Sequence, residues 1–342
     1  MVTAPTTATW VKPHFRWAGF LMSLTARHGF APAERDDGEV IHRPVLLEET
    51  LQFLAVSAGG VYVDGTLGEG GHSQRILEAS GPDGVVLGID RDPRSLAVAR
   101  RRLDAFGTRA RLAHGNYADM QRIAESNGIN AVDGILLDLG FSSRQVSAAG
   151  YGFSFQTDEP LDMRYDRSGE TAADLVNTLS ERELADVIFQ YGEERRSRAI
   201  ARAILSSRPV LTTGQLAQVV ARSVGGRRGG RHPATRTFQA LRIAVNGELT
   251  HVEAGLAAAG ELLKPGGRVA VISYHSLEDR LVKDWVDRET AACICPPDLP
   301  VCACEQQPRF RSVRRRTVRP SEEEQTINPR SRSARLRVAE RI

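Results

Sequence analysis

The stretch VYVDGTLGEGGH, residues 61–72, decides the fold that this sequence predicts. An apolar strand ends in an acid, Asp64, and continues into a glycine-rich turn and then a helix, the start of a nucleotide-type site in an α/β sheet. The glycines let the backbone approach a ligand more closely than any Cβ would allow. Their spacing differs from the G-x-G-x-x-G fingerprint, so the stretch does not predict a dinucleotide site.

The same alternation continues along the chain. From residue 41 onward, apolar runs alternate with helical periodicity, which is typical of a mostly parallel, doubly wound sheet with crossover helices. We expect a helix to begin at Pro44, because proline is favoured in a first turn. We expect another to be capped by Asp92 with Pro93 behind it. The expected strands are residues 61–64, 85–90, 110–114, 134–138, 268–273 and, last, 336–339.

Residues 145–231 follow a different pattern, with no convincing strand and several helical periodicities. After a capping-box-like pair, Ser180 and Glu183, four side chains fall on one helix face: Leu184, Val187, Ile188 and Tyr191. We therefore predict an α/β core of residues 39–144 and 232–342, interrupted by an all-helical, substrate-binding insertion of residues 145–231. Residues 1–38 are interpreted as a flexible extension, or as an upstream start with Met22 as the alternative.

Charge is informative through its distribution. The formal net charge is only +3, but arginines crowd into residues 195–202, 222–236 and 309–319. Local basic patches on a balanced protein suit a docked polyanion, although solvated surface is the better explanation of any single cluster. No stretch approaches the roughly 18 unbroken apolar residues that span a bilayer, so we expect no membrane association.

The cysteines lie in one short segment, at Cys293, Cys295, Cys302 and Cys304. They do not form a framework spread through the fold, which favours a reducing cytoplasm. Their C-x-C pairs are narrower than the C-x₂₋₄-C pairs usual in structural zinc sites. We therefore expect free thiols or an occasional disulfide, and no metal, with zinc as the open alternative.

Asp90 ends the second expected strand, where the switch-point rule places ligands. Its carboxylate can accept hydrogen bonds from a ribose diol, whereas Asp92 fits helix capping better. Tyr117, after the third strand, either lies against an adenine or is an ordinary half-buried aromatic. An acid, three residues and then G-x-G-G is typical of methyltransferase cofactor loops, so we predict S-adenosylmethionine, which has no pyrophosphate to cradle.

The loop after the fourth strand is expected to face the transferable methyl group. Its candidate catalytic residues are Asp138, Phe141, Ser142 and Ser143. The exocyclic amine of cytosine is a poor nucleophile, because its lone pair is delocalised into the ring. Hydrogen-bond acceptors in the loop can hold this amine, while an aromatic side chain stacks on the base. Carbon-5 chemistry would need a cysteine nucleophile near this loop, and none is present. We therefore expect in-line transfer to an amine without a covalent intermediate.

Several longer strings carry a family resemblance. They are residues 63–73, 88–93, 133–140, 152–155 with 160–164, 191–195, 232–240 and 272–280. In these strings, and over about residues 42–341, the chain resembles the bacterial 16S rRNA cytosine-N4 methyltransferase family (RsmH, formerly MraW). The resemblance implies a Rossmann-like class I methyltransferase core with an inserted helical domain.

The resemblance also implies an activity and a partner. The expected reaction is S-adenosylmethionine-dependent N4-methylation of a cytidine in the decoding centre of 16S rRNA, in the cytoplasm, on naked RNA or the small ribosomal subunit. Monomer and homodimer both stay open. The implied cofactor contacts are Gly70, Gly71, His72, Asp90, Tyr117, Asp138 and Gln145. The family loop reads Ser-Ser-Pro-Gln, but Arg144 replaces the proline here, which leaves the Gln145 contact less well supported.

Five further residues are candidates for substrate or RNA contacts: Arg164, His232, Arg236, Gln239 and His275. Each has an alternative. Arg164 could simply pair with Asp162. His232, Arg236 and Gln239 could belong to a helix start with a solvated polar face. His275 could cap the next helix, with support from Ser276 and Asp279. Rival functions are methylation of DNA or protein, a nicotinamide-dependent oxidoreductase that the glycine spacing disfavours, and a non-catalytic assembly factor.

Overall fold

The computed structural model describes residues 35–36, 39–40, 44–140, 150–225, 232–295, 302 and 304–342. The chain forms two compact units, Met1–Ile41 and His42–Ile342. In the first unit the described residues form two short antiparallel strands, β1 (Arg35–Asp36) and β2 (Glu39–Val40). All that follows concerns the second unit.

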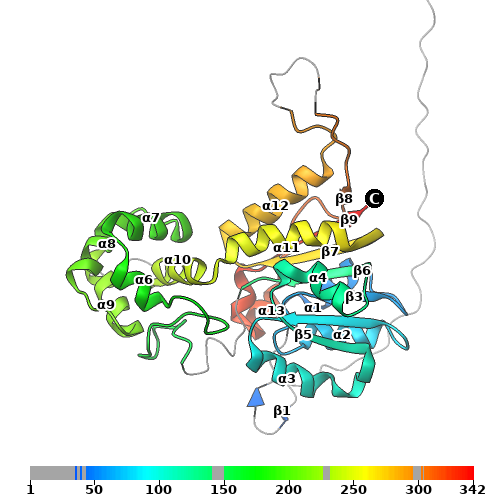
Figure 1. The fold of residues 1–342 in the computed structure, drawn as a ribbon, viewed down its shortest axis with the longest axis horizontal. Helices are drawn as coiled ribbons and strands as arrows, with labels where there is room; N and C mark the ends of the chain where they lie inside the picture. The colour runs from blue at the N-terminus through cyan, green and yellow to red at the C-terminus, as the bar shows by residue number, and fades with distance from the viewer. Residues whose placement is uncertain are drawn as a thin grey trace, which may run out of the picture. The chain divides into compact units, whose positions relative to one another are not determined.

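A seven-stranded sheet forms the centre of this unit, in the order β5-β4-β3-β6-β7-β9-β8 (Figure 1). The strands are β3 (Val61–Asp64), β4 (Val85–Asp90), β5 (Ala110–His114), β6 (Val132–Asp138), β7 (Leu263–Ser273), β8 (Phe310–Ser312) and β9 (Arg335–Arg341). Strands β3 to β7 are parallel, and β9 is antiparallel to both β7 and β8. The predicted Rossmann-like, mostly parallel sheet is confirmed, and β8 is an addition that we did not predict.

The strand order reverses between β3 and β6, since β4 and β5 continue on one side and β7 on the other. This is the topological switch point at which α/β sheets open a crevice beyond the carboxyl ends of their strands. The expected strands at Val61–Asp64, Val85–Asp90 and Ala110–His114 have the predicted bounds. The sequence pattern therefore located the crevice correctly.

Helices cover both faces of the sheet. One hydrophobic cluster joins strand residues to α4 (Met120–Ser126), α11 (Glu248–Leu262) and α12 (Ser276–Thr290). The other cluster joins strand residues to α1 (Leu47–Leu54), α2 (Gly71–Ala79) and α3 (Pro93–Leu103). Neighbouring strand residues alternate between the two, as Leu136 and Leu137 do, because successive side chains of a strand point to opposite faces.

Two predicted helix starts have different outcomes. Asp92 caps α3 by accepting a hydrogen bond from the Arg94 amide at 2.9 Å, with Pro93 at the first helical position, as predicted. The predicted start at Pro44 is wrong, because α1 begins at Leu47. Leu46 has a left-handed backbone (φ 52°), and its amide donates to Glu324 Oε1 at 2.8 Å. That distant contact, from α13 (Glu322–Ile327), breaks the helix before Leu47.

A second group of helices packs around its own hydrophobic cluster (Figure 1). It contains α6 (Ala172–Thr178), α7 (Glu181–Gly192), α8 (Ser197–Ser206), α9 (Thr213–Ser223) and α10 (Thr235–Asn246). Helix α7 begins with the predicted Ser180–Glu183 capping box. The cluster runs from Leu161 to Leu241, so it continues into α10, beyond residue 231, where we placed the end of the insertion.

Within the described ranges, no helix combines the length and the apolar character needed to cross a bilayer.

Candidate active site

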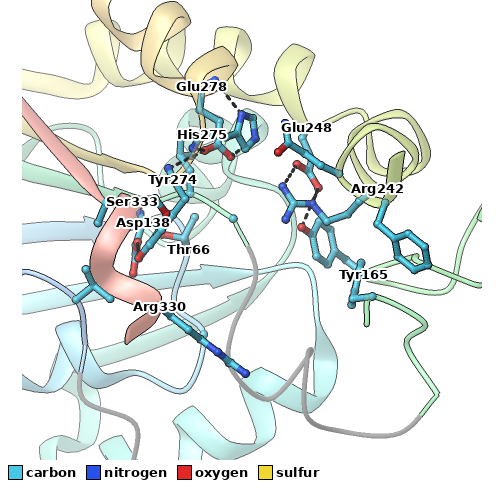
Figure 2. A pocket seen from close by; sticks show the side chains of 18 of the residues that line it. Thr66, Asp138, Tyr165, Arg242, Glu248, Tyr274, His275, Glu278, Arg330 and Ser333 are labelled. Carbon is cyan, nitrogen blue, oxygen red and sulfur yellow. Dashed lines mark hydrogen bonds and ion pairs between the residues drawn. The ribbon is translucent and has the colours of Figure 1, made fainter. Parts of the chain in front are cut away.

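A cavity of about 1290 Å³ lies at the switch point (Figure 2). The carboxyl ends of β3, β4, β6 and β7 and the segments that follow them form one wall, through residues such as His72, Asp90 and Asp138. The opposite wall comes from the helical group, with Phe153, Phe155 and Gln239 among its residues. The site is therefore shared between the sheet and the helices that interrupt it.

The glycine-rich turn is held in shape by hydrogen bonds from its own side chains. Asp64 accepts from Ser73 Oγ at 2.7 Å and from the Thr66 amide at 3.2 Å, which ties the strand end to helix α2. Burial is the main cause that raises the pKa of Asp64 to about 6. Thr66 Oγ1 in turn accepts from the Asp138 amide at 2.6 Å, so the turn after β3 is joined to the end of β6.

The two predicted cofactor glycines differ in position. Gly71 lines the cavity, and a Cβ there would meet Pro44 Cγ at 2.5 Å. Gly70 is not among the lining residues. Its φ of 80° and its packing against Leu103 explain it as a turn glycine at the start of α2, so the contact expected of it is not supported.

Asp90 lies at the end of β4 and lines the cavity. Its oxygens accept hydrogen bonds from the amides of Gly68 (2.7 Å) and Asp92 (2.8 Å), and each carboxylate oxygen can accept one more. Burial raises the pKa of Asp90 to about 6. Asp92, by contrast, is buried and bonds to Tyr151 Oη at 2.6 Å besides capping α3. The structure thus separates the two acids in the predicted way.

Asp138 lies at the end of β6, between the cofactor-type turn and the segment after β7 (Figure 2). Its Oδ1 accepts from Tyr274 Oη at 2.8 Å, and its Oδ2 lies 3.9 Å from His72 Nδ1. Burial raises the pKa of Asp138 to about 7. Burial also lowers the pKa of His72 to about 4, so that imidazole is neutral at physiological pH.

The tautomer of His72 follows from its other contact. Nε2 lies 3.0 Å from the carbonyl oxygen of Val45, which can only accept, so Nε2 carries the proton. Nδ1 therefore presents a lone pair toward Asp138. When Asp138 is ionised, at pH values above about 7, the two groups are therefore two proton acceptors and not an ion pair.

The sequence analysis missed a polar group on the other wall. Arg242 and Glu248 form a bidentate pair (2.8 and 2.9 Å), and Tyr165 Oη donates to Glu248 at 2.9 Å. All three line the cavity (Figure 2). Tyr165 directly follows Arg164, which we selected, but no local signal separates it from an ordinary core tyrosine. Arg242 and Glu248 lie in an apolar helix pattern, where charges usually face solvent.

Four of the five predicted substrate residues line the cavity: His232, Arg236, Gln239 and His275. Arg164 does not. It forms a bidentate pair with Asp162 (2.7 and 2.9 Å) and donates to the Gly169 carbonyl at 3.0 Å. Of the two roles that we left open for Arg164, the structure supports pairing with Asp162.

His275 is the N-cap of α12, where Nδ1 accepts from the Glu278 amide at 3.4 Å. The capping role is confirmed, but the supporting pair is not Ser276 with Asp279. Instead, Glu278 Oε2 accepts hydrogen bonds from the amides of Tyr274 and His275 (2.9 and 3.3 Å). Asp279 instead accepts from Arg335 (2.6 Å) and Arg337 (2.8 Å) on β9. A tertiary contact with β9 thus takes the carboxylate that we assigned to the cap.

Two other predicted residues also have structural partners. Gln239 Nε2 donates to the Tyr191 carbonyl at 3.1 Å, and His232 stacks against Phe155 with 4.5 Å between ring centroids. Of the remaining predictions, Tyr117 lines the cavity, and Phe141, Ser142, Ser143 and Gln145 lie outside the described residues.

Arginines gather at the rim of the cavity, on the segment before β9 and at the first residue of that strand: Arg319, Arg330, Arg332 and Arg335. Arg335 is paired with Asp279. Within the described part of the chain, Arg330 and Arg332 have no acidic partner, and Figure 2 shows Arg330 extending away from the Asp138–Tyr274 pair. This rim is suited to a polyanion.

Glu248, His275 and Glu278 approach one another closely enough to hold a metal ion. Each acid already has a structural task, however, because Glu248 neutralises Arg242 and Glu278 completes the α12 cap. The arrangement is better explained as a buried polar network than as a metal site.

The chain has similar proteins of known name. Ribosomal RNA small subunit methyltransferase H of Thermomicrobium roseum is 57% identical over 314 residues, which cover 91% of this chain and 96% of that protein. The protein of the same name from Dehalococcoides mccartyi is 55% identical over 89% of this chain and 87% of its own length. A solved structure, Aeropyrum pernix fibrillarin with natively bound S-adenosyl-L-methionine, aligns with 83% of this chain and 67% of that chain, at 10% identity and a TM-score of 0.35.

A family model also matches the whole of the second unit. It is that of the MraW methylase family, and it matches residues 39–342. The match includes the switch-point turn, the two acids at the ends of β4 and β6, and the helical group that closes the cavity. The chain therefore belongs to the MraW methylase family.

Proposed function

We propose that this chain transfers the methyl group of S-adenosylmethionine to the N4 amine of a cytidine in 16S rRNA. One observation carries the proposal: a half-buried carboxylate, Asp138, lies beside the cofactor-type turn and faces a cavity that arginines also line. The relatives named ribosomal RNA small subunit methyltransferase H support RNA of the small subunit as the acceptor.

The cofactor is assigned to the wall formed by β3 and β4. Asp90 would hold the ribose diol, and the turn at Gly68 and Gly71 would lie along the methionine portion. Tyr117 would cover the adenine; its ring packs on Gly255, where a Cβ would meet Tyr117 Cδ2 at 2.5 Å, which keeps the ring against helix α11. When bound, the cofactor supplies an electrophilic sulfonium methyl group.

Asp138 is assigned to the amine. The exocyclic nitrogen attacks the methyl carbon, the carbon–sulfur bond breaks with its electrons going to sulfur, and the amine proton passes to an acceptor. The ionised carboxylate of Asp138 is that acceptor, oriented by the hydroxyl of Tyr274. Phe141, Ser142 and Ser143 remain candidates for holding the base. Alignment of amine and methyl is worth about 7–11 kcal/mol in such reactions.

The opposite wall is assigned to RNA. Arg236, Gln239 and His232 line it, together with the aromatic rings of Phe153 and Phe155. Single-stranded RNA is recognised largely by stacking of unpaired bases on aromatic rings, and arginines supply the affinity for phosphate. A cytidine that leaves its stack can enter the cavity between the two walls.

The test uses labelled methyl transfer. The full chain would be incubated with S-adenosylmethionine carrying a radioactive methyl group and, in parallel, with small ribosomal subunits, naked 16S rRNA, DNA and bulk protein. We expect label only in the first two, and N4-methylcytidine after digestion to nucleosides. Label in another nucleoside would refute the amine assignment, and label in DNA or protein would refute the acceptor class. If no acceptor became labelled in this assay, the result would favour the alternative of a non-catalytic assembly factor.

A further inference from the structure

We propose that Cys293, Cys295, Cys302 and Cys304 bind one structural zinc ion through four thiolates. The four sulfurs come together in the described structure, all within 4.8 Å of one another. Two of the residues follow helix α12 and two precede strand β8, so the site would join the two arms of the connection between these elements (Figure 1).

The sulfur separations have the values that a tetrahedral ion requires. Four of the six are 3.5 Å for Cys293–Cys302, 3.6 Å for Cys302–Cys304, 3.8 Å for Cys293–Cys304 and 4.0 Å for Cys295–Cys302, and the other two are at most 4.8 Å. Four sulfurs at about 2.3 Å from a central zinc lie about 3.8 Å apart. A disulfide would instead bring two sulfurs to about 2.05 Å and separate that pair from the others.

The narrow C-x-C spacing, which led us to expect no metal, is overcome by a local turn. In an extended strand the first and third side chains lie on one face but about 6–7 Å apart along the chain. Here the Cys295 amide donates to Cys293 Sγ at 3.4 Å, so the backbone curls around the first sulfur. The Ile294 amide donates to Cys304 Sγ at 3.5 Å, across the two arms. Amide donors of this kind are the usual outer partners of ligating groups and offset thiolate charge.

Apolar burial does not drive the approach of the four described cysteines. Ile294 is 53% exposed, and Cys293 and Cys302 are exposed as well, so little apolar burial drives the approach. Fixing each backbone residue costs about 1–2 kcal/mol. The base of the connection is held by a hydrogen bond from the Arg309 amide to the Glu289 carbonyl at 2.9 Å, but that bond lies beyond the cysteines. A metal ion supplies the missing free energy of ordering.

The experiment measures metal in the full chain, purified under reducing conditions without a chelator. Plasma mass spectrometry should find one zinc per chain and little iron. The variant Cys302→Ser/Cys304→Ser should lose the zinc and keep its circular dichroism spectrum, because the site lies outside the hydrophobic clusters. Ile294→Ser, which changes the same segment but no ligand, should keep one zinc per chain.

A second measurement makes the result independent of how the protein was purified. Metal-free protein would be titrated with Co²⁺ and then Zn²⁺ under reductant. We expect the visible d–d and sulfur-to-cobalt absorption of tetrahedral thiolate coordination, abolished by one equivalent of zinc. Absence of these bands, with all four thiols of the zinc-treated native protein reacting freely with a thiol reagent, would overturn the proposal. So would an intact mass showing disulfides in protein that binds no cobalt after reduction.

Discussion

Asp138 shows how one residue's surroundings set its chemistry. Its carboxylate is half-buried at a strand end, accepts a hydrogen bond from Tyr274 and lies near the neutral ring of His72. Burial disfavours the charged form, which is why its pKa rises from 3.8 to about 7. A carboxylate poised near neutrality is a better proton acceptor than an ordinary aspartate, because acceptor strength rises with pKa.

Replacing Asp138 should therefore separate catalysis from binding. In Asp138→Asn we expect kcat to fall by roughly a hundredfold or more, which is the usual range for a lost proton acceptor. The affinity for S-adenosylmethionine, measured by calorimetry, should change by less than about threefold, since uncharged Asn keeps an oxygen toward Tyr274 and the cofactor is assigned mainly to Asp90 and Tyr117. A variant with full kcat would contradict the role given to this carboxylate.

The pH dependence has a definite sign. Protonation of Asp138 removes the acceptor, so the single-turnover rate should fall as the pH drops through about 7. Stability should change in the opposite direction. Because the folded-state pKa lies above the ordinary 3.8, the native protein binds this proton more tightly, and unfolding free energy decreases from about pH 4 to pH 7.

Urea denaturation across that pH range provides the check. The pKa values of Asp64 and Asp90 are also raised, to about 6. In wild type the slope of unfolding free energy against pH should therefore be the sum of the contributions of all three acids. Asp138→Asn should reduce this slope by up to about 1.4 kcal/mol per pH unit in the range where Asp138 titrates, which corresponds to one bound proton. An unchanged slope would mean that Asp138 stays ionised in the fold.

Asp90 carries the cofactor prediction. Asp90→Ala should weaken S-adenosylmethionine binding by roughly ten- to a hundredfold, because a charge-assisted hydrogen bond contributes about 1.5–3 kcal/mol. The loss of its bonds to the amides of Gly68 and Asp92 adds to this effect. Asp90→Asn keeps one acceptor oxygen, so its affinity for S-adenosylmethionine, measured by calorimetry, should lie between those of wild type and Asp90→Ala. Equal affinities for wild type and Asp90→Ala would refute the ribose assignment.

At the scale of elements, a buried ion pair joins helices α10 and α11 on the helical wall. Arg242 of α10 and Glu248 of α11 are 7% and 8% exposed, respectively, and meet across Gly247, whose φ of 61° lets α10 end and α11 begin at once. Tyr165 completes the group from the loop before α6. A buried pair of this kind fixes the geometry of two helices, and removing one partner leaves a buried charge.

Stability variants can test this junction. Arg242→Ala should lower the unfolding free energy by about 3–5 kcal/mol, because Glu248 loses its counter-charge. The double variant Arg242→Met/Glu248→Gln should recover more than half of that loss in urea denaturation. Lys283→Ala provides the matched control, since its pair with Asp287 is exposed and should contribute less than about 1 kcal/mol. A double variant as unstable as the single one would locate the effect in packing.

At the scale of the whole second unit, the sheet and the helical group divide the work. The sheet side brings the acids Asp90 and Asp138 to the cavity, whereas the rim before β9 brings Arg330 and Arg332. Asp90 and Asp138 are at most half-exposed at the strand ends, whereas Arg330 and Arg332 are exposed. Such a distribution attracts a polyanion to the mouth without neutralising the reacting carboxylate.

Arg330→Ala should therefore weaken binding of 16S rRNA fragments and leave the affinity for S-adenosylmethionine unchanged. We expect the slope of log K against log salt to decrease by about 0.7, the value for one contact with a single-stranded phosphate. Arg122→Ala, an exposed arginine of α4 away from the cavity, is the matched control and should keep the slope. An identical change in both variants would mean that only net charge matters.

Local sequence was enough to predict the parallel strands, the glycine-rich turn, the Asp92 cap of α3 and the α7 capping box. These features are set by residues close together in the chain: a strand by period-two burial, a cap by side chains three residues apart. The position of Asp90 at the cavity could also be predicted, because the carboxyl ends of the strands meet at the switch point.

Only the tertiary structure decided the rest. The start of α1 depends on Glu324, Asp279 turned to β9 instead of its own helix, and Tyr274 joined Asp138 from a distant strand end. The convergence of four thiols likewise depends on a turn that the C-x-C spacing does not reveal. In each case the contact joins residues that are brought together by packing. Local sequence does not show which distant residue will lie close enough to form it.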